Sequence, residues 1–246
     1  MKQTKLIMGM PITVKIAHKN AAKHFATLFA YFRAVDARYS TYKKDSEISL
    51  INDGLPEAKW SAEMKSVLEL CEQTRKDTKG YFNITHYGKR DPSGLVKGWA
   101  VANAADMLLK NKVTDFYIEA GGDIQVHGTD RRHRPWTIGI RNPFNIEEIV
   151  KTIRVSSEGI ATSGTYIRGQ HIYNPFQPDA TIDRVRSVTV IGPNVYEADR
   201  FATAAFAMGE QGIGFIESTP GLEGYMVTDD KLATYTSGFE RYTSNV

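Results

Sequence analysis

Two long segments of the chain place apolar residues at helical spacing. The pattern over residues 21–38 predicts an amphipathic helix through Phe25, Leu28, Phe29, Phe32 and Val35. Residues 61–79 repeat it through Met64, Val67, Leu68, Cys71 and Thr74. Two further helices are predicted at residues 98–110 and 197–208, the second after Pro193-Asn194. Cys71 falls on an apolar helix face, so we interpret its thiol as a buried small hydrophobe rather than a reactive group.

Shorter segments carry the pattern of strands. Alternation over residues 12–16 predicts one strand, and a final hairpin is predicted from 224–228 and 232–236 across Asp229-Asp230. The other predicted strands are 114–118, 124–127, 136–141, 149–155, 159–162 and 187–191. Helices and strands do not alternate in a βαβ rhythm, so we expect an α+β fold with mixed or antiparallel sheets and packed helices. No linker divides residues 1–246, which predicts a single domain of two intimately packed halves.

Composition narrows the function classes. The chain has 246 residues, of which 41% are hydrophobic and 24% charged, so disorder and coiled coil are excluded. A net charge of +3, with no stripe of basic residues along the chain, argues against a protein that binds nucleic acid. The single cysteine excludes an intrachain disulfide and a multi-cysteine zinc site. No apolar run resembles a signal peptide core or a membrane span, so we expect a cytoplasmic protein without a membrane partner.

Residues 91–100, Asp-Pro-Ser-Gly-Leu-Val-Lys-Gly-Trp-Ala, combine small residues with a lysine. We expect a turn directly before the helix at 98–110. A helix N-terminus presents free N–H groups and favours a phosphate, and Lys97 would add a positive charge. The alternative is a turn glycine beside a surface lysine.

Asp199 and Thr203 are four residues apart on the helix predicted at 197–208 and share one face. A carboxylate and a hydroxyl are hard oxygen ligands that suit Mg²⁺. The alternative is a helix cap or an ordinary solvated pair. His171, between two strand-like segments and near Tyr166 and Arg168, is a candidate general base or a structural histidine.

Near the N-terminus, Asp45 or Ser46 is expected to cap a short helix ending near Asn52, which leaves Tyr42 to stack on a flat ring. The remaining histidines, His86 among them, have no comparable neighbours in the sequence, and none has zinc-site spacing.

The order of these motifs resembles the ApbE family, the FAD:protein FMN transferases. The resemblance runs from about residue 8 to 239 and rests on Met8-Gly9-Met10-Pro11, Ser40-Thr41-Tyr42 with residues 45–49, residues 80–85, residues 91–100, Gly121-Gly122-Asp123, residues 136–143, Thr162-Ser163-Gly164, residues 171–175, and Ala198-Asp199 with Ala202-Thr203. It implies an ApbE-like fold and an enzyme that uses Mg²⁺ and FAD. Such an enzyme moves FMN onto a threonine hydroxyl of an acceptor protein through a phosphoester bond and releases AMP.

The resemblance also implies roles for particular residues. Contacts with FAD are implied for Met8, Tyr42, Tyr81, Phe82, Asn83, Asp91, Lys97, Ile172 and Tyr173. The metal ligands implied are the Gly94 carbonyl, Asp199 and Thr203, and the candidate base is His171. The chain has Asn83 and Asn174 where the family commonly has Asp. For Gly121-Gly122-Asp123, a structural and a ligand-binding role stay equally open.

Two other functions fit the same residues. Water could replace the acceptor threonine, which would make the protein a Mg²⁺-dependent FAD pyrophosphatase that releases FMN and AMP. A non-catalytic FAD-binding protein is the other alternative, and the joint presence of Asp199, Thr203 and His171 argues against it.

Overall fold

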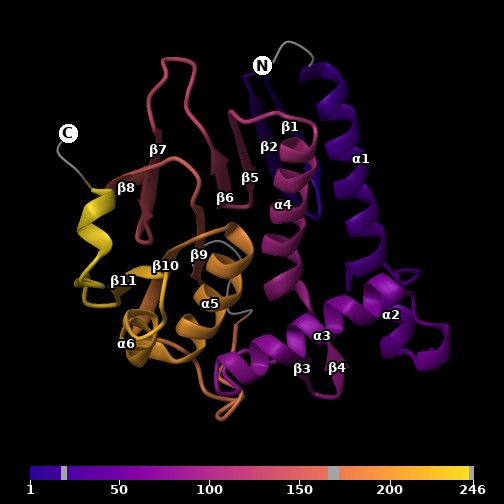
Figure 1. The fold of residues 1–246 in the computed structure, drawn as a ribbon. Coiled ribbons are helices and arrows are strands. Elements are labelled where there is room, and N and C mark those ends of the chain that lie inside the picture. Colours follow the sequence, from indigo (N-terminus) through magenta and orange to yellow (C-terminus); the bar gives the residue numbers. More distant parts are fainter. Residues whose placement is uncertain (18–20, 166–171, 244–246) are drawn as a thin grey trace.

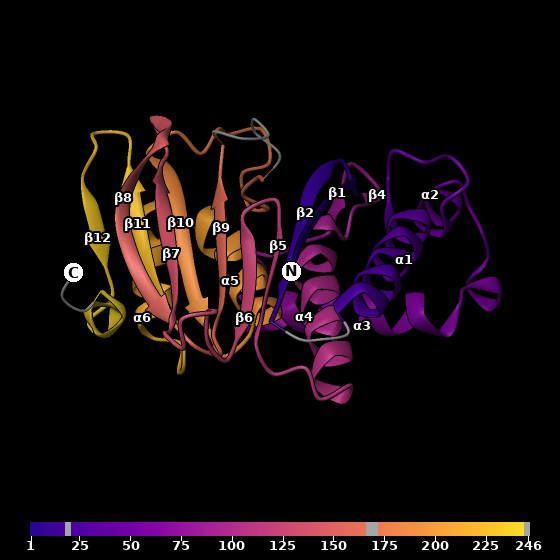
Figure 2. The same ribbon diagram turned by 90° about the horizontal axis from the view of Figure 1, so that it is seen from above.

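An eight-stranded sheet forms the centre of the fold in the computed structural model, which describes residues 1–17, 21–165 and 172–243 (Figures 1 and 2). Its strand order is β1-β2-β5-β6-β9-β10-β11-β12, and each neighbouring pair is antiparallel. The strands are β1 (Lys2–Ile7), β2 (Met10–Ile16), β5 (Phe116–Ala120), β6 (Asp123–His127), β9 (Gly159–Gly164), β10 (Val185–Gly192), β11 (Glu223–Thr228) and β12 (Ala233–Tyr235). The sheet therefore joins elements from the beginning, middle and end of the chain.

Helices cover one face of this sheet in two groups. The first group packs on β2 and β5 around Phe25, Phe29 and Phe116, and comprises α1 (Ala21–Tyr39), α2 (Glu47–Asn52), α3 (Ala62–Asp77) and α4 (Ser93–Lys110). The second packs on β9, β10 and β11 and comprises α5 (Val195–Ala207) and α6 (Gly212–Glu217). Helices α4 and α5 stand next to each other (Figure 1), so the two groups meet along one helix pair.

The opposite face of the sheet carries a separate hairpin. Strands β7 (Trp136–Asn142) and β8 (Asn145–Val155) lie in front of β10 and β11 in Figure 2, with α5 and α6 behind the sheet. Ile138 and Ile153 of the hairpin pack against the sheet together with Phe239. A second small hairpin, β3 (Thr85–His86) and β4 (Lys89–Arg90), lies between α3 and α4 in the chain, and three short 3₁₀ helices complete the fold at Glu57–Lys59, Gly209–Gln211 and Phe239–Tyr242.

The strongest sequence patterns are confirmed. The α+β class with antiparallel sheets is confirmed, as are the helices predicted at 21–38 and 61–79, which form α1 and α3. Ser46 caps α2 and Ser61 caps α3 through the backbone N–H groups three residues ahead. Cys71 is buried as predicted, and its burial raises the pKa of the thiol to about 12. No helix in the described part of the chain is long and apolar enough to cross a bilayer. The cytoplasmic location stays a prediction.

The third helix was predicted wrongly at its beginning. Helix α4 begins at Ser93 rather than at residue 98, so Gly94 and Lys97 lie within the helix instead of in a turn before it. Asp91 accepts a hydrogen bond from the Ser93 N–H, and Pro92 stands at the N-cap, where its fixed φ is compatible with helix entry. The glycines suggested a turn, but a helix tolerates them where packing requires the absence of a side chain.

Candidate functional site

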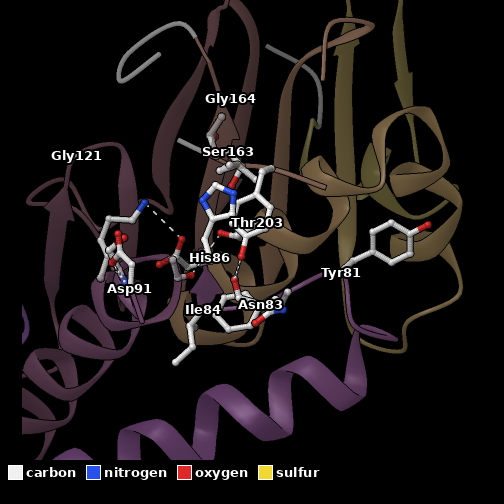
Figure 3. Close-up of a pocket in the computed structure, with 17 residues that line it drawn as sticks. Tyr81, Asn83, Ile84, His86, Asp91, Gly121, Ser163, Gly164 and Thr203 are labelled. Atoms are coloured by element: carbon white, nitrogen blue, oxygen red, sulfur yellow. Dashed lines mark hydrogen bonds and ion pairs between the residues drawn. The ribbon is translucent and has the colours of Figure 1, made fainter. Parts of the chain in front are cut away.

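A cavity lies where the segment after α3 meets the first turns of α4, the end of β9 and helix α5 (Figure 3). It brings together most of the residues implied as functional, namely Tyr81, Phe82, Asn83, Asp91, Gly94, Lys97, Ile172, Tyr173, Asp199 and Thr203. These residues come from four separate parts of the sequence. Their convergence in one cavity makes it the candidate functional site.

Two of the implied residues that the structure describes do not line the cavity, and a third lies outside the described residues. Met8 is half-buried in the turn between β1 and β2, with a φ of 57°, and packs against the core. Tyr42 is 97% exposed. His171 lies outside the described residues, so its proposed role stays a prediction.

Sequence reasoning missed several lining residues. His86 was set aside for lack of neighbours, yet its imidazole stacks on the ring of Tyr173 at 4.0 Å between centroids and lines the cavity (Figure 3). Ile84, Ser93, Gly121, Thr162, Ser163 and Gly164 also line the cavity. The position of His86 between residues 81–83 and Asp91, both implied as FAD contacts, was the available signal.

Close packing of α4 on α5 sets the position of Asp199. The Gly98 N–H donates a hydrogen bond to Oδ2 of Asp199 at 2.7 Å. A Cβ on Gly98 would lie 2.6 Å from the Cβ of Asp199 and 2.7 Å from the carbonyl oxygen of Val195. Only glycine allows this approach, so residue 98 fixes the carboxylate at the base of the cavity.

Two buried carboxylates share the ammonium group of Lys97. Asp199 is 2% exposed and Asp123 is fully buried. The Lys97 Nζ lies 2.6 Å from Oδ2 of Asp123 and 3.4 Å from Oδ1 of Asp199. Burial, followed by the charge of Asp123, raises the pKa of Asp199 well above its usual range, while Lys97 and the Gly98 N–H act in the opposite direction. The sequence left the role of Asp123 open, and the structure places its carboxylate beneath the site as the buried partner of Lys97.

The oxygen donors near Asp199 suit a small hard cation. Oγ1 of Thr203 donates to the carbonyl oxygen of Gly94 at 3.4 Å, which brings these two oxygens together beside the Asp199 carboxylate. Mg²⁺ prefers such oxygens and keeps water or phosphate in its other positions. Over the described ranges there is no cluster of three or more His, Cys, Asp or Glu residues that could hold a metal. The candidate set has one carboxylate, one hydroxyl and one carbonyl, and its chemistry fits Mg²⁺.

Hydrogen bonds to the backbone fix the aromatic wall of the cavity. The Tyr173 hydroxyl donates to the carbonyl oxygens of Asn83 and Thr85 at 3.0 and 2.9 Å. The Phe82 N–H donates to Oγ1 of Thr78 at 3.0 Å. Burial and the nearby charge of Asp91 raise the pKa of Tyr173, which keeps its hydroxyl protonated and able to donate. Hydrogen bonds within the protein therefore hold the aromatic wall in place without a ligand.

The two asparagines that stand where the resemblance implies aspartate, Asn83 and Asn174, have local roles. Oδ1 of Asn83 accepts the Thr85 N–H at 2.9 Å, and Oδ1 of Asn174 accepts the Phe176 N–H at 2.9 Å. Both are turns in which the side chain binds the backbone two residues ahead. An aspartate oxygen would accept the same bonds, so the replacement preserves the backbone shape and removes one charge at each position.

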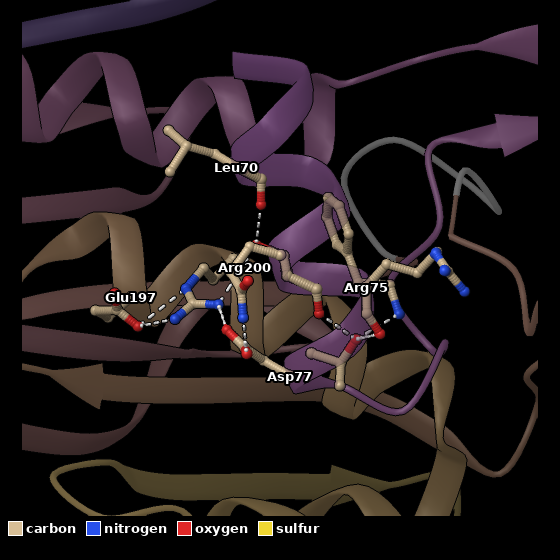
Figure 4. A network of polar contacts seen from close by, with 9 residues as sticks. Leu70, Arg75, Asp77, Glu197 and Arg200 are labelled. Atoms are coloured by element: carbon tan, nitrogen blue, oxygen red, sulfur yellow. Dashed lines mark hydrogen bonds and ion pairs between the residues drawn. The ribbon is translucent and has the colours of Figure 1, made fainter. Parts of the chain in front are cut away.

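A buried arginine ties α5 to α3 behind the cavity (Figure 4). The Arg200 guanidinium donates to Asp77 of α3 at 2.7 Å and to Glu197 of α5 at 2.6 Å. It also stacks over the ring of Phe201 at 4.2 Å. Asp77 is the last residue of α3, so this ion pair holds the segment leading to residues 81–83 against the helix that carries Asp199.

Comparison with known proteins agrees with this geometry. A family model described as "ApbE family" matches residues 8–89 and 88–226. A FAD:protein FMN transferase from Vibrio cholerae is 33% identical over 159 residues, which cover 60% of this chain and 47% of that protein. One from Haemophilus influenzae is 24% identical over 282 residues, covering 87% of this chain and 82% of that protein. The chain spans about half the length of the first curated relatives it matches.

Solved structures share the fold. The ApbE protein from Thermotoga maritima aligns with a TM-score of 0.88 and 21% identity, covering 100% of this chain and 99% of the other. The flavin transferase ApbE from Vibrio cholerae aligns with a TM-score of 0.86 and 22% identity, covering 98% of each chain. At these identities the structural likeness establishes the architecture.

Proposed function

The chain belongs to the ApbE family, and from this premise we propose that it is a Mg²⁺-dependent FAD:protein FMN transferase. In the proposed reaction the hydroxyl oxygen of an acceptor threonine attacks the phosphorus on the FMN side of the FAD diphosphate. The bond from that phosphorus to the bridging oxygen breaks, AMP leaves, and the hydroxyl loses its proton. The acceptor protein keeps FMN through a phosphoester bond, which is a post-translational flavinylation.

One observation carries the proposal: aromatic walls and a charged oxygen-donor base occupy the same cavity. Tyr173, Phe82 and Ile172 supply surfaces for flat rings. Lys97 and the oxygens of Asp199 and Thr203 lie at the base, where a diphosphate and its cation would sit. A flavin dinucleotide has both a flat ring system and a diphosphate, so its two chemical parts match the two parts of the cavity.

The residues at the base suit phosphoryl transfer. Bound Mg²⁺ would neutralise diphosphate oxygens and help to align the attacking and leaving oxygens. Asp199, Thr203 and Gly94 would hold it, and Lys97 would place a positive charge beside the phosphates. His171 is the proposed base for the threonine proton, with a contribution of about 10²–10⁴ in rate.

The test follows an acceptor domain by intact mass after incubation with FAD and Mg²⁺. A mass gain equal to FMN in phosphoester linkage, absent with EDTA and with Asp199→Ala, is the expected result. Asp106→Ala is the matched control because this exposed carboxylate lies on α4 and does not line the cavity. His171→Ala is expected to bind FAD and transfer FMN slowly.

Other outcomes assign other functions. Accumulation of free FMN and AMP without modification of any acceptor would mean that water is the nucleophile and the protein is an FAD pyrophosphatase. Bound FAD without turnover on two different acceptors would mean a flavin-binding protein.

A further inference from the structure

Beneath the lining of the cavity, a fully buried carboxylate that the proposed cation site does not use, Asp123, pairs with the lining residue Lys97. Asp123 opens β6 directly after Gly121 and Gly122, whose φ values of 58° and 99° make the tight turn from β5. The turn places the Asp123 side chain inside the protein, where Oδ1 accepts the Thr162 N–H of β9 at 3.3 Å. The carboxylate is therefore held by the sheet, whereas Lys97 and Asp199 belong to helices α4 and α5.

The Lys97 ammonium group lies at unequal distances from the two buried carboxylates. Lys97 Nζ is 2.6 Å from Asp123 but 3.4 Å from Oδ1 of Asp199. The other oxygen of Asp199, Oδ2, is occupied by the Gly98 N–H. Within the described part of the chain, Oδ1 is thus the Asp199 oxygen without a backbone hydrogen bond, and it is the Asp199 oxygen that lies within ion-pair distance of the ammonium group.

We propose that Asp123 is a positioning residue that holds the Lys97 ammonium away from Oδ1 of Asp199 and so preserves that oxygen for the divalent cation. The inference rests on the proposed function, because it concerns the cation site of that function. Without Asp123, Asp199 would be the carboxylate still within ion-pair distance of the half-buried Lys97 ammonium group, which would close on it. A direct ion pair would then compete with the cation for the same oxygen, since buried charges are costly to leave unpaired.

The test measures cation binding without turnover, using Mn²⁺ and its free-ion electron paramagnetic resonance signal on the metal-free protein. Asp123→Asn is expected to weaken Mn²⁺ binding about tenfold, a change of about 1.4 kcal/mol. In a Lys97→Met background the same substitution is expected to weaken binding less than about threefold, because no ammonium group is present to move. Asp106→Asn, an exposed carboxylate on the same helix as Lys97, is the control and should bind like wild type.

The outcomes separate this inference from its premise. If Asp123→Asn weakened Mn²⁺ binding equally in the wild-type and Lys97→Met backgrounds, Asp123 would act only through its own charge, and the inference would be overturned. Failure of the wild-type protein to bind Mn²⁺ would remove the cation site itself, and with it both the Mg²⁺ part of the proposed function and this inference. FAD binding by the same sample would leave the flavin part intact.

A second variant covers the case in which Asp123→Asn does not fold. Lys97→Met alone should raise Mn²⁺ affinity by less than about threefold, because Asp123 already restrains the ammonium group in the wild-type protein. A larger rise would mean that Lys97 competes freely for Asp199 and would overturn the inference.

Discussion

Substitution of Gly98 by alanine should both destabilise the protein and displace Asp199. The added Cβ would lie 2.6 Å from the Cβ of Asp199. Unstrained carbon contacts begin at roughly 3.4 Å, so α4 and α5 must separate by roughly 0.8 Å. The Gly98 N–H···Oδ2 bond, now 2.7 Å, would stretch to roughly 3.5 Å, beyond a normal hydrogen bond. The substitution therefore acts on the helix pair and on the cation site together.

The magnitude follows from three opposing effects. Overpacking costs about 1–3 kcal/mol, and loss of a hydrogen bond to a carboxylate costs about 1.5–3 kcal/mol. The higher helix propensity of alanine than of glycine offsets about 1 kcal/mol of these costs. The net loss of about 1.5–5 kcal/mol corresponds to a fall in Tm of roughly 3–20 °C for a chain of this length.

Thermal unfolding of the metal-free protein and Mn²⁺ titration are the two assays. Gly214→Ala is the matched control, because Gly214 lies in helix α6 and no atom lies within 4 Å of its added Cβ. It should leave Tm unchanged or raise it slightly. The reasoning is refuted if Gly98→Ala melts within about 1 °C of wild type and binds Mn²⁺ equally well.

Four further measurements probe other parts of the structure. Arg200→Met should cost about 2–3 kcal/mol in urea unfolding, because it leaves partly buried carboxylates unpaired. Burial raises the pKa of Asp77, but the hydrogen bonds from Arg200 and Gln73 and the charge of Arg200 together outweigh it, and the net pKa is lowered. The stabilisation is therefore present above the usual aspartate pKa, and the difference from Arg200→Met should shrink below about pH 4. Cys71 should resist thiol reagents at pH 8 until the protein unfolds, and rapid labelling of the native protein would contradict its burial. Ser46→Ala should lower stability by about 1 kcal/mol through loss of the α2 cap, and an unchanged urea midpoint would contradict it. Asp199→Asn should raise the Tm of the EDTA-treated protein at pH 8, because it removes a buried carboxylate whose pKa is raised. The same substitution should abolish the stabilisation of the protein by Mg²⁺. A lower Tm in EDTA would contradict this reasoning.

Much of the fold was predictable because strong periodicity reflects burial. Helix α1 runs from Ala21 to Tyr39 along the predicted range, and its apolar positions Phe25, Phe29 and Phe32 are fully buried. The predictions failed where tertiary contacts outweigh local preference. Strand β1 is mostly exposed and has no apolar alternation, so only its pairing with β2 makes it a strand. Helix α4 begins early because Gly94 and Gly98, poor helix formers, fit the close contact with α5.

Most of the residues that the motifs pointed to line one cavity, but the sequence did not show how their charges are arranged. The order of motifs along the chain pointed to residues that the structure gathers in one cavity, from Tyr81 to Thr203. No spacing rule shows which carboxylate an ammonium group will approach across a fold. The pairing of Lys97 with Asp123 depends on the β5–β6 turn, and His86 reaches the cavity through a hairpin too short to show strand alternation.

The base of the cavity also explains why ligand binding and stability should be linked in this protein. Two buried carboxylates around one ammonium group leave one net negative charge away from water, which disfavours the folded state. The raised pKa of Asp199 expresses the same penalty. A divalent cation bound at Asp199 would relieve it, so part of the intrinsic binding energy should appear as stabilisation of the fold. The excess buried charge beneath the cavity is therefore physical support for the proposed cation-dependent function.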